Sequence, residues 1–160
     1  MSCMQFGPAS LFPGKGRAFL YTKRFSGVEE NYHTDWLGRF ELDIAIPTAR
    51  IGIEYDGEAW HTNPDRDSRK DLLCQENNYS LIRIREKGCP IIETPSTTYQ
   101  MENNKKDLPK AIQFVADRIC EKFGYNPVFL DIDIERDRAE ITKLIGTGEY
   151  EDVIVEYETD

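Results

Sequence analysis

Two short stretches in the first half of the chain alternate hydrophobic and polar residues with a period of two. The hydrophobic positions are Phe40, Leu42, Ile44 and Ile46 in the first stretch and Ile51, Ile53 and Tyr55 in the second. Successive side chains of a β-strand point to opposite faces of a sheet, so each stretch predicts a half-buried strand. The connection at 47–50 is short enough for a hairpin, and its register places Asp43 opposite Glu54 and Glu41 opposite Asp56.

The polar positions of both stretches carry carboxylates. Like charges placed directly opposite each other on antiparallel strands are destabilising, because their Cβ atoms lie only about 4.5–5.5 Å apart. One interpretation is the solvated face of an ordinary amphipathic hairpin, and the other is a site that holds a cation. The second is favoured by the lack of Lys or Thr among the acids, by Gly57 directly after them and by Trp60-His61 in the next loop. Clusters of oxygen ligands suit Mg²⁺ or Mn²⁺.

A helix and a further strand follow the second stretch. Asn63 is a favourable cap for the helix, and Pro64 suits its first position. Lys70 on this helix either points towards the acids or belongs to a solvated basic face. The segment 80–85 (SLIRIR) predicts a strand with isoleucines on one face and Leu81, Arg83 and Arg85 on the other. Those two arginines either contact phosphate or pair with the acids.

These residues resemble the PD-(D/E)XK arrangement of the restriction-endonuclease-like superfamily. The resemblance is carried by Asp43, ten intervening residues and Glu54-Tyr55-Asp56. The continuation through Gly57, Trp60-His61 and 82–86 (IRIRE) is similar to the very-short-patch-repair endonucleases and their small relatives. The similarity covers 38–90 and, more loosely, 131–141. It implies an α/β domain in which helices flank a restriction-endonuclease-like mixed sheet.

The resemblance also implies roles for individual residues. Asp43 would be the principal ligand of a magnesium or manganese ion, Glu54 the second acidic position, and the backbone carbonyl of Tyr55 a further ligand. His61 would act near the attacking water, and its ordinary pKa near 6.5 lets an imidazole accept a proton at neutral pH. Asp56 occupies the position of the superfamily's lysine. We therefore expect Asp56 to serve as an accessory acid of the catalytic set.

The expected function is that of a metal-dependent endonuclease which hydrolyses phosphodiester bonds and nicks or cleaves DNA. Lys70, Arg83 and Arg85 are the expected nucleic-acid contacts. The alternative is a catalytically inactive, nuclease-like domain that binds nucleic acid or another protein, and it is motivated by the missing lysine.

Length and composition predict one globular domain. The chain has 160 residues, of which 39% are hydrophobic, and we expect a core at about 36–146 with an acidic tail at about 147–160. The net charge is −9, but residues 128–160 contain eleven acids and three basic residues. The rest of the chain is therefore close to neutral. A cation among the strand acids would give that part a net positive charge towards a phosphate backbone.

The cysteines and the hydropathy of the chain indicate a reduced, cytoplasmic protein without structural zinc. Cys3, Cys74, Cys89 and Cys120 show no paired spacing and no neighbouring histidine. No secretory signal is recognisable, and no apolar stretch approaches the length of about 18 residues that a membrane span needs. His33 has no acidic strand context, and we expect it at the surface.

The remaining segments predict two more helices and two more strands. An amphipathic helix is expected at 107–123, where Gly124 ends it, and an irregular connection is expected before it at 87–107. Further predictions are a strand at 128–132, a helix at 133–145 and an edge strand at 153–157.

Overall fold

The computed structural model describes residues 22, 25, 27–58, 61–93, 96–102, 106–133 and 136. Within them, five strands form one mixed sheet in sequence order. The strands are β1 (Glu29–Tyr32), β2 (Leu42–Ile46), β3 (Ile51–Asp56), β4 (Ser80–Glu86) and β5 (Thr97–Met101). β2 lies between β1 and β3 and is antiparallel to both, whereas β3, β4 and β5 run parallel.

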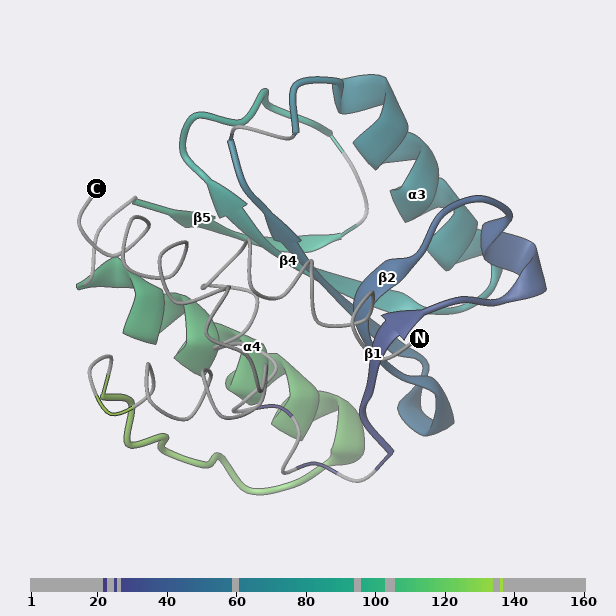
Figure 1. Ribbon diagram of the computed structural model, residues 1–160. Coiled ribbons are helices and arrows are strands. Elements are labelled where there is room, and N and C mark those ends of the chain that lie inside the picture. The colour runs from purple at the N-terminus through teal and green to yellow at the C-terminus, as the bar shows by residue number, and fades with distance from the viewer. Residues whose placement is uncertain are drawn as a thin grey trace.

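Two helices cover opposite faces of this sheet (Figure 1). Helix α3 (Pro64–Glu76) connects β3 to β4, and α4 (Asp107–Phe123) follows β5. The face towards α4 carries the larger hydrophobic cluster, which includes Ile53, Ile84 and Val115. The face towards α3 carries a smaller cluster that includes Cys74 and Leu81. The predicted α/β class and the mixed sheet with flanking helices are confirmed.

The hairpin between β2 and β3 has the predicted register. Ile44 pairs with Ile53, and Ile46 pairs with Ile51. The connection is a short 3-10 turn, Pro47–Ala49, after which Arg50 adopts a left-handed backbone conformation with φ 53°. In this register Asp43 and Glu54 occupy facing positions just beyond the regular pairs.

The strict alternation predicted for 40–46 is wrong at Asp43. Leu42 packs in the cluster on the α3 side, whereas Ile44 packs in the cluster on the α4 side. The change of side coincides with the end of the regular pairs between β2 and β3 at Ile44–Ile53. Beyond this point, carboxylates of both strands bind backbone N–H groups of the neighbouring strand. The two strands separate there, and the acids lie at the opening.

The helix boundaries agree with the predicted signals. The side chain of Asn63 accepts a hydrogen bond from the Asp65 N–H (3.0 Å) and caps α3, with Pro64 at its first position. Gly124 ends α4 with φ 73°, a conformation that a residue without Cβ adopts readily. The strand face that carries Leu81, Arg83 and Arg85 is directed towards α3.

Other predictions need correction or fall outside the described residues. The region 87–107 contains strand β5, which was expected to be irregular. Residues 128–132 form no strand. The predicted helix 133–145, apart from residues 133 and 136, and the edge strand 153–157 lie outside the described residues. Among the described residues we find no helix with the length and apolar character needed to cross a membrane.

Candidate metal centre and its polar network

The side chains of Asp43 and Glu54 each accept a hydrogen bond from the backbone of the other's strand, at the point where β2 and β3 separate. The Asp43 N–H donates to Glu54 Oε1 (3.0 Å), and the Tyr55 N–H donates to Asp43 Oδ2 (2.9 Å). Each carboxylate thus takes the place of a backbone carbonyl as the hydrogen-bond acceptor between the two strands. Both carboxylates are held beside the N–H groups of Asp43 and Tyr55. This brings together the three residues that the resemblance implied as metal ligands.

Glu54 is buried and has a shifted pKa. It is buried, at 1% exposure, and Lys70 Nζ donates to its Oε2 at 2.8 Å. Burial raises the pKa of Glu54 to about 6, the charge of Asp43 adds to the rise, and Lys70 opposes it. Burial lowers the pKa of Lys70, but the charges of Glu54 and Asp43 and the hydrogen bond to Glu54 together outweigh that effect, and the pKa of Lys70 is raised. At neutral pH Glu54 and Lys70 form an ion pair.

Lys70 brings a cation to the centre from a different element than the motif would. The superfamily's lysine position follows the second acid on the same strand, and Asp56 stands there. Lys70 instead lies in the second turn of α3, from which its ammonium group contacts Glu54. Of the two alternatives for Lys70, the structure therefore supports the one in which it points towards the acids.

Asp56 belongs to a second, buried group of charges next to this centre. Its Oδ1 accepts from Arg83 Nη1 (2.7 Å), and its Oδ2 accepts from Arg85 Nη1 (2.7 Å). Arg83 also donates from Nε to Asp71 Oδ1 (2.9 Å). Both arginines are buried and paired with acids, and therefore they are not placed for phosphate contact. The expected nucleic-acid role of Arg83 and Arg85 is corrected accordingly.

His61 is oriented by an acid on α3. Its backbone N–H donates to the Gly57 carbonyl (3.0 Å), and its Nδ1 lies 3.0 Å from Asp67 Oδ1. Asp67 also accepts from Arg85 Nη1 (3.0 Å). Burial raises the pKa of Asp67, but the hydrogen bond and charge of His61 and the hydrogen bond of Arg85 lower it more, to about 2. Because Asp67 is ionised, Nδ1 carries the proton, and Nε2 is the basic nitrogen of neutral His61.

The surroundings also change the basicity of His61. Burial alone lowers the pKa of His61, whereas the hydrogen bond to Asp67 and the charge of Asp56 raise it. The net effect is a pKa above the ordinary value of 6.5. His61 Nδ1 lies 3.4 Å from Asp56 Oδ1, so both carboxylates favour the imidazolium form. The hydrogen bond to Asp67 and the two neighbouring carboxylates therefore stabilise the protonated form of His61, and its role as a base stays a prediction.

Asp56, His61 and Asp67 form another geometrically possible metal group. One ligand atom from each lies within 4.8 Å of the others. Both oxygens of Asp56 and one of Asp67 already accept hydrogen bonds from guanidinium groups. A cation placed there would face Arg83 and Arg85 across the same carboxylates. Glu54 is paired in the same way, because its Oε1 accepts from the Asp43 N–H and its Oε2 accepts from Lys70.

No family model, no curated protein and no solved structure matches this chain. The chemical interpretation of the site accordingly rests on the placement of its own side chains.

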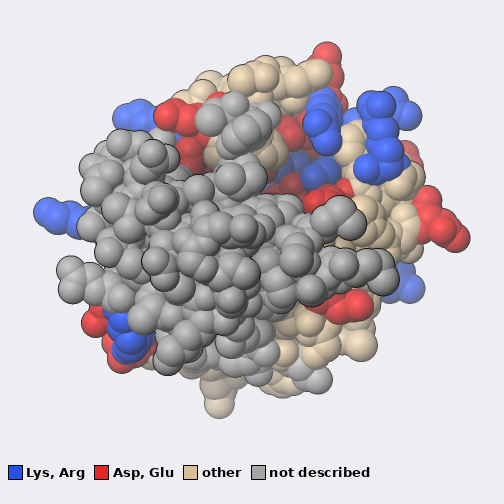
Figure 2. Space-filling model, viewed as in Figure 1, with Lys and Arg blue, Asp and Glu red and all other residues tan. Residues whose placement is uncertain are grey.

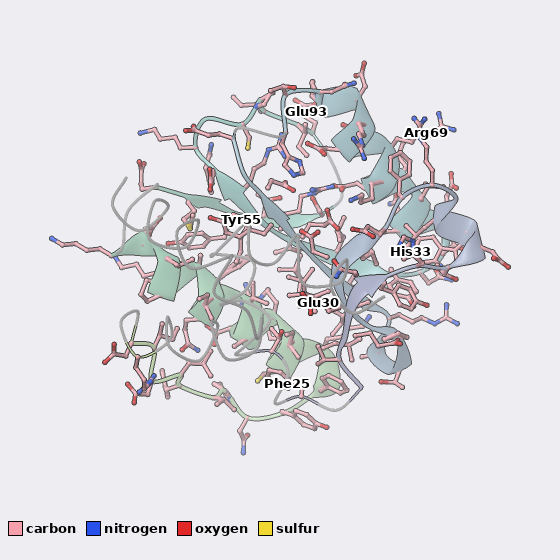
Figure 3. All side chains as sticks on the ribbon, in the orientation of Figure 1. Phe25, Glu30, His33, Tyr55, Arg69 and Glu93 are labelled. Carbon is pink, nitrogen blue, oxygen red and sulfur yellow. The ribbon has the colours of Figure 1, made fainter. Side chains whose placement is uncertain are left out.

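Not every predicted acid joins the centre, and two residues of the network were missed. Glu41 precedes β2 and pairs with the exposed His33 (2.8 Å), which lies at the surface as expected (Figure 3). Neither Asp67 nor Asp71 was among the site residues predicted from the sequence. Their signal is the i, i+4 spacing, which places both acids on the helix face that also presents Lys70. Trp60 lies outside the described residues.

Proposed function

We propose that this chain is an endonuclease that uses Mg²⁺ or Mn²⁺ to hydrolyse phosphodiester bonds, with DNA as its substrate. The observation that carries the proposal is the pair of reciprocal carboxylate–backbone hydrogen bonds that fixes Asp43 and Glu54 at the strand opening. Lys70 adds a cation at 2.8 Å from Glu54. Two acids, an adjacent backbone carbonyl and a lysine are a suitable donor set for a hard divalent ion and a phosphate.

Each residue of the centre would have a separate role in binding the metal ion or the phosphate. Asp43 and Glu54 would hold the ion, with the carbonyl of Tyr55 as a further ligand, in keeping with the resemblance to restriction-endonuclease-like proteins. A divalent ion supplies positive charge against the phosphoryl oxygens as negative charge develops on them. Lys70 would keep Glu54 ionised and would present an ammonium group to the substrate phosphate or to the water that attacks it.

His61 would act as the proton acceptor. Its Nδ1 proton faces Asp67, so Nε2 is the nitrogen that can take a proton from water. Asp67 stabilises the imidazolium that results, because its own pKa lies at about 2. Asp56 would act indirectly, by holding Arg83 and Arg85 in the position that supports His61 and Asp67.

A plasmid-nicking assay tests the proposal. Wild-type protein with Mg²⁺ or Mn²⁺ should convert supercoiled plasmid to the nicked or linear form, and EDTA should stop the conversion. Asp43→Asn should lower the rate at least about 100-fold, as expected when a charged group that acts on the transition state is lost. Asp117→Asn is the matched control, because Asp117 lies on α4, on the opposite face of the sheet. Equal nicking by wild type and Asp43→Asn would refute the assignment.

The same assay separates the competing function. A nuclease-like domain that binds nucleic acid without cutting is favoured by Asp56 at the motif's lysine position. In that case the wild-type protein would retard DNA in a gel in the presence of Mg²⁺ but leave the plasmid supercoiled. Cleavage that depends on both Lys70 and Asp43 would instead show that α3 provides the required cation.

A further inference from the structure

Two arginines from different parts of the chain lie against one phenyl ring beside the candidate centre. The Cζ atoms of Arg39 and Arg66 lie 5.5 Å and 5.7 Å from the centroid of the Phe40 ring. Phe40 itself is buried, whereas both arginines are exposed residues. Contact with the ring face attracts a guanidinium group and restricts its motion. We call Arg39, Phe40 and Arg66 the arginine clamp.

The two arginines of the clamp form no ion pair within the part of the chain that the structure describes. No described carboxylate forms an ion pair with Arg39 or Arg66, nor with Arg69, which projects outward from α3 (Figure 3). Arg83 and Arg85, by contrast, are paired with buried acids. In a protein with a net charge of −9, neighbouring positive charges without acidic partners favour the binding of an anion.

The clamp lies next to the candidate metal centre along two elements. Phe40 comes three residues before Asp43, and Arg66 comes four residues before Lys70, which contacts Glu54. Four residues of an α-helix span about 6 Å along its axis and return to the same face. Arg66 is therefore displaced from the centre by one helical turn. Figure 2 shows Lys and Arg side chains gathered on the side of α3, beside Asp and Glu side chains.

We propose that the arginine clamp binds a phosphodiester group of a nucleic-acid strand, next to the phosphate that is cleaved. The ligand chemistry follows from the groups present. Guanidinium groups donate in pairs to phosphate oxygens, and Phe40 holds them in place before the substrate arrives. The spacing of one helical turn is comparable to the advance from one phosphate to the next along a strand. The position of the clamp relative to the cleaved phosphate depends on the proposed function, whereas its binding of phosphodiester does not.

The test is a binding titration by fluorescence anisotropy. Fluorescein-labelled DNA and RNA oligonucleotides of the same sequence are titrated with protein in Ca²⁺, and again in EDTA. The Arg39→Gln/Arg66→Gln protein is compared with wild type and with Arg39→Lys/Arg66→Lys, which keeps the charge. Arg118→Gln is the matched control, because Arg118 also lies over a phenyl ring, that of Phe114 at 5.1 Å, but on α4. Thermal unfolding of each variant establishes that it is folded.

We expect the double glutamine variant to bind about tenfold more weakly than wild type at low salt. The slope of log affinity against log salt should become shallower by about one, because the clamp is proposed to neutralise one phosphate. The lysine variant should keep most of the slope, and Arg118→Gln should behave as wild type. Comparison of DNA with RNA shows which strand the clamp accepts.

Three results would overturn the inference, and they are distinguishable from failure of the proposed function. Unchanged affinity and slope in the glutamine variant, with nicking by wild type intact, would refute the proposed role of the clamp and leave the proposed nuclease function in place. An equal loss of affinity in Arg118→Gln would show that the effect comes from the overall charge of the protein and not from the clamp. No binding of either oligonucleotide by wild type would remove both proposals. Binding that depends on the clamp in a protein that does not nick DNA would leave the clamp in place and remove the nuclease.

Discussion

Replacement of Arg83 by methionine tests how the buried charges of this fold are balanced. Arg83 is fully buried, at 0% exposure, and its guanidinium group donates to the carboxylates of Asp56 and Asp71. Asp56 keeps Arg85 in the variant, but Asp71 loses its cation, and Asp71 Oδ2 already lacks a hydrogen-bond partner. Removal of one partner from a buried ion pair costs about 3–5 kcal/mol, because the remaining charge is left uncompensated.

That magnitude is a large part of the whole stability, since domains of this size unfold with about 5–15 kcal/mol. Urea unfolding followed by circular dichroism should therefore show a markedly lower midpoint for Arg83→Met. Arg118→Met is the control, because it breaks a partly exposed pair with Glu121 that contributes about 0–1 kcal/mol. The double variant Arg83→Met/Asp71→Leu should recover part of the loss, because it removes the stranded carboxylate. A loss below 1 kcal/mol in Arg83→Met would refute this account of the network.

Three further predictions concern the site itself. Lys70→Met should lower the nicking rate about 100-fold while the fold persists, and Lys70→Arg should keep part of the rate; full activity of Lys70→Met in the plasmid assay would contradict the role given to its ammonium group. Asp67→Asn should lower the pKa of His61, measured by NMR titration, because the variant removes a negative charge that raises it; an unchanged pKa would argue against the His61–Asp67 pair. Because the pKa of Glu54 is raised from 4.5 to about 6, the folded protein binds more protons than the unfolded chain in that window, and metal-free stability should fall by about 2 kcal/mol as pH rises through it. Glu54→Gln should abolish this part of the pH dependence in thermal unfolding, and an identical profile for the variant would show that Glu54 does not cause it.

The sequence was most informative where local patterns determine structure. Period-two alternation and a four-residue connection were sufficient to predict the register that brings Asp43 and Glu54 together. Capping chemistry predicted the start of α3 at Asn63 and Pro64. These features depend on neighbours along the chain or across one hairpin, which a single sequence displays.

Features that depend on contacts between distant elements were not predictable in the same way. The ion pair of Lys70 with Glu54 needs the angle at which α3 crosses the sheet, which no local pattern specifies. The pairing of Arg83 with Asp71 could not be predicted for the same reason. The partner of an arginine on a strand face depends on which side chains of the covering helix lie against it. Strand β5 was missed because its five residues, TTYQM, lack clear alternation and gain their stability from parallel pairing with β4.

The measurement that tests the central claim most directly is a calorimetric titration of the protein with Mn²⁺ at pH 7.5. We predict one site whose binding heat is lost in Asp43→Asn and strongly reduced in Glu54→Gln, but retained in Asp67→Asn. Retention in Asp67→Asn distinguishes the strand opening from the group of Asp56, His61 and Asp67. Absence of binding in wild type, or binding that survives Asp43→Asn and disappears in Asp67→Asn, would contradict the assignment of the metal to Asp43 and Glu54.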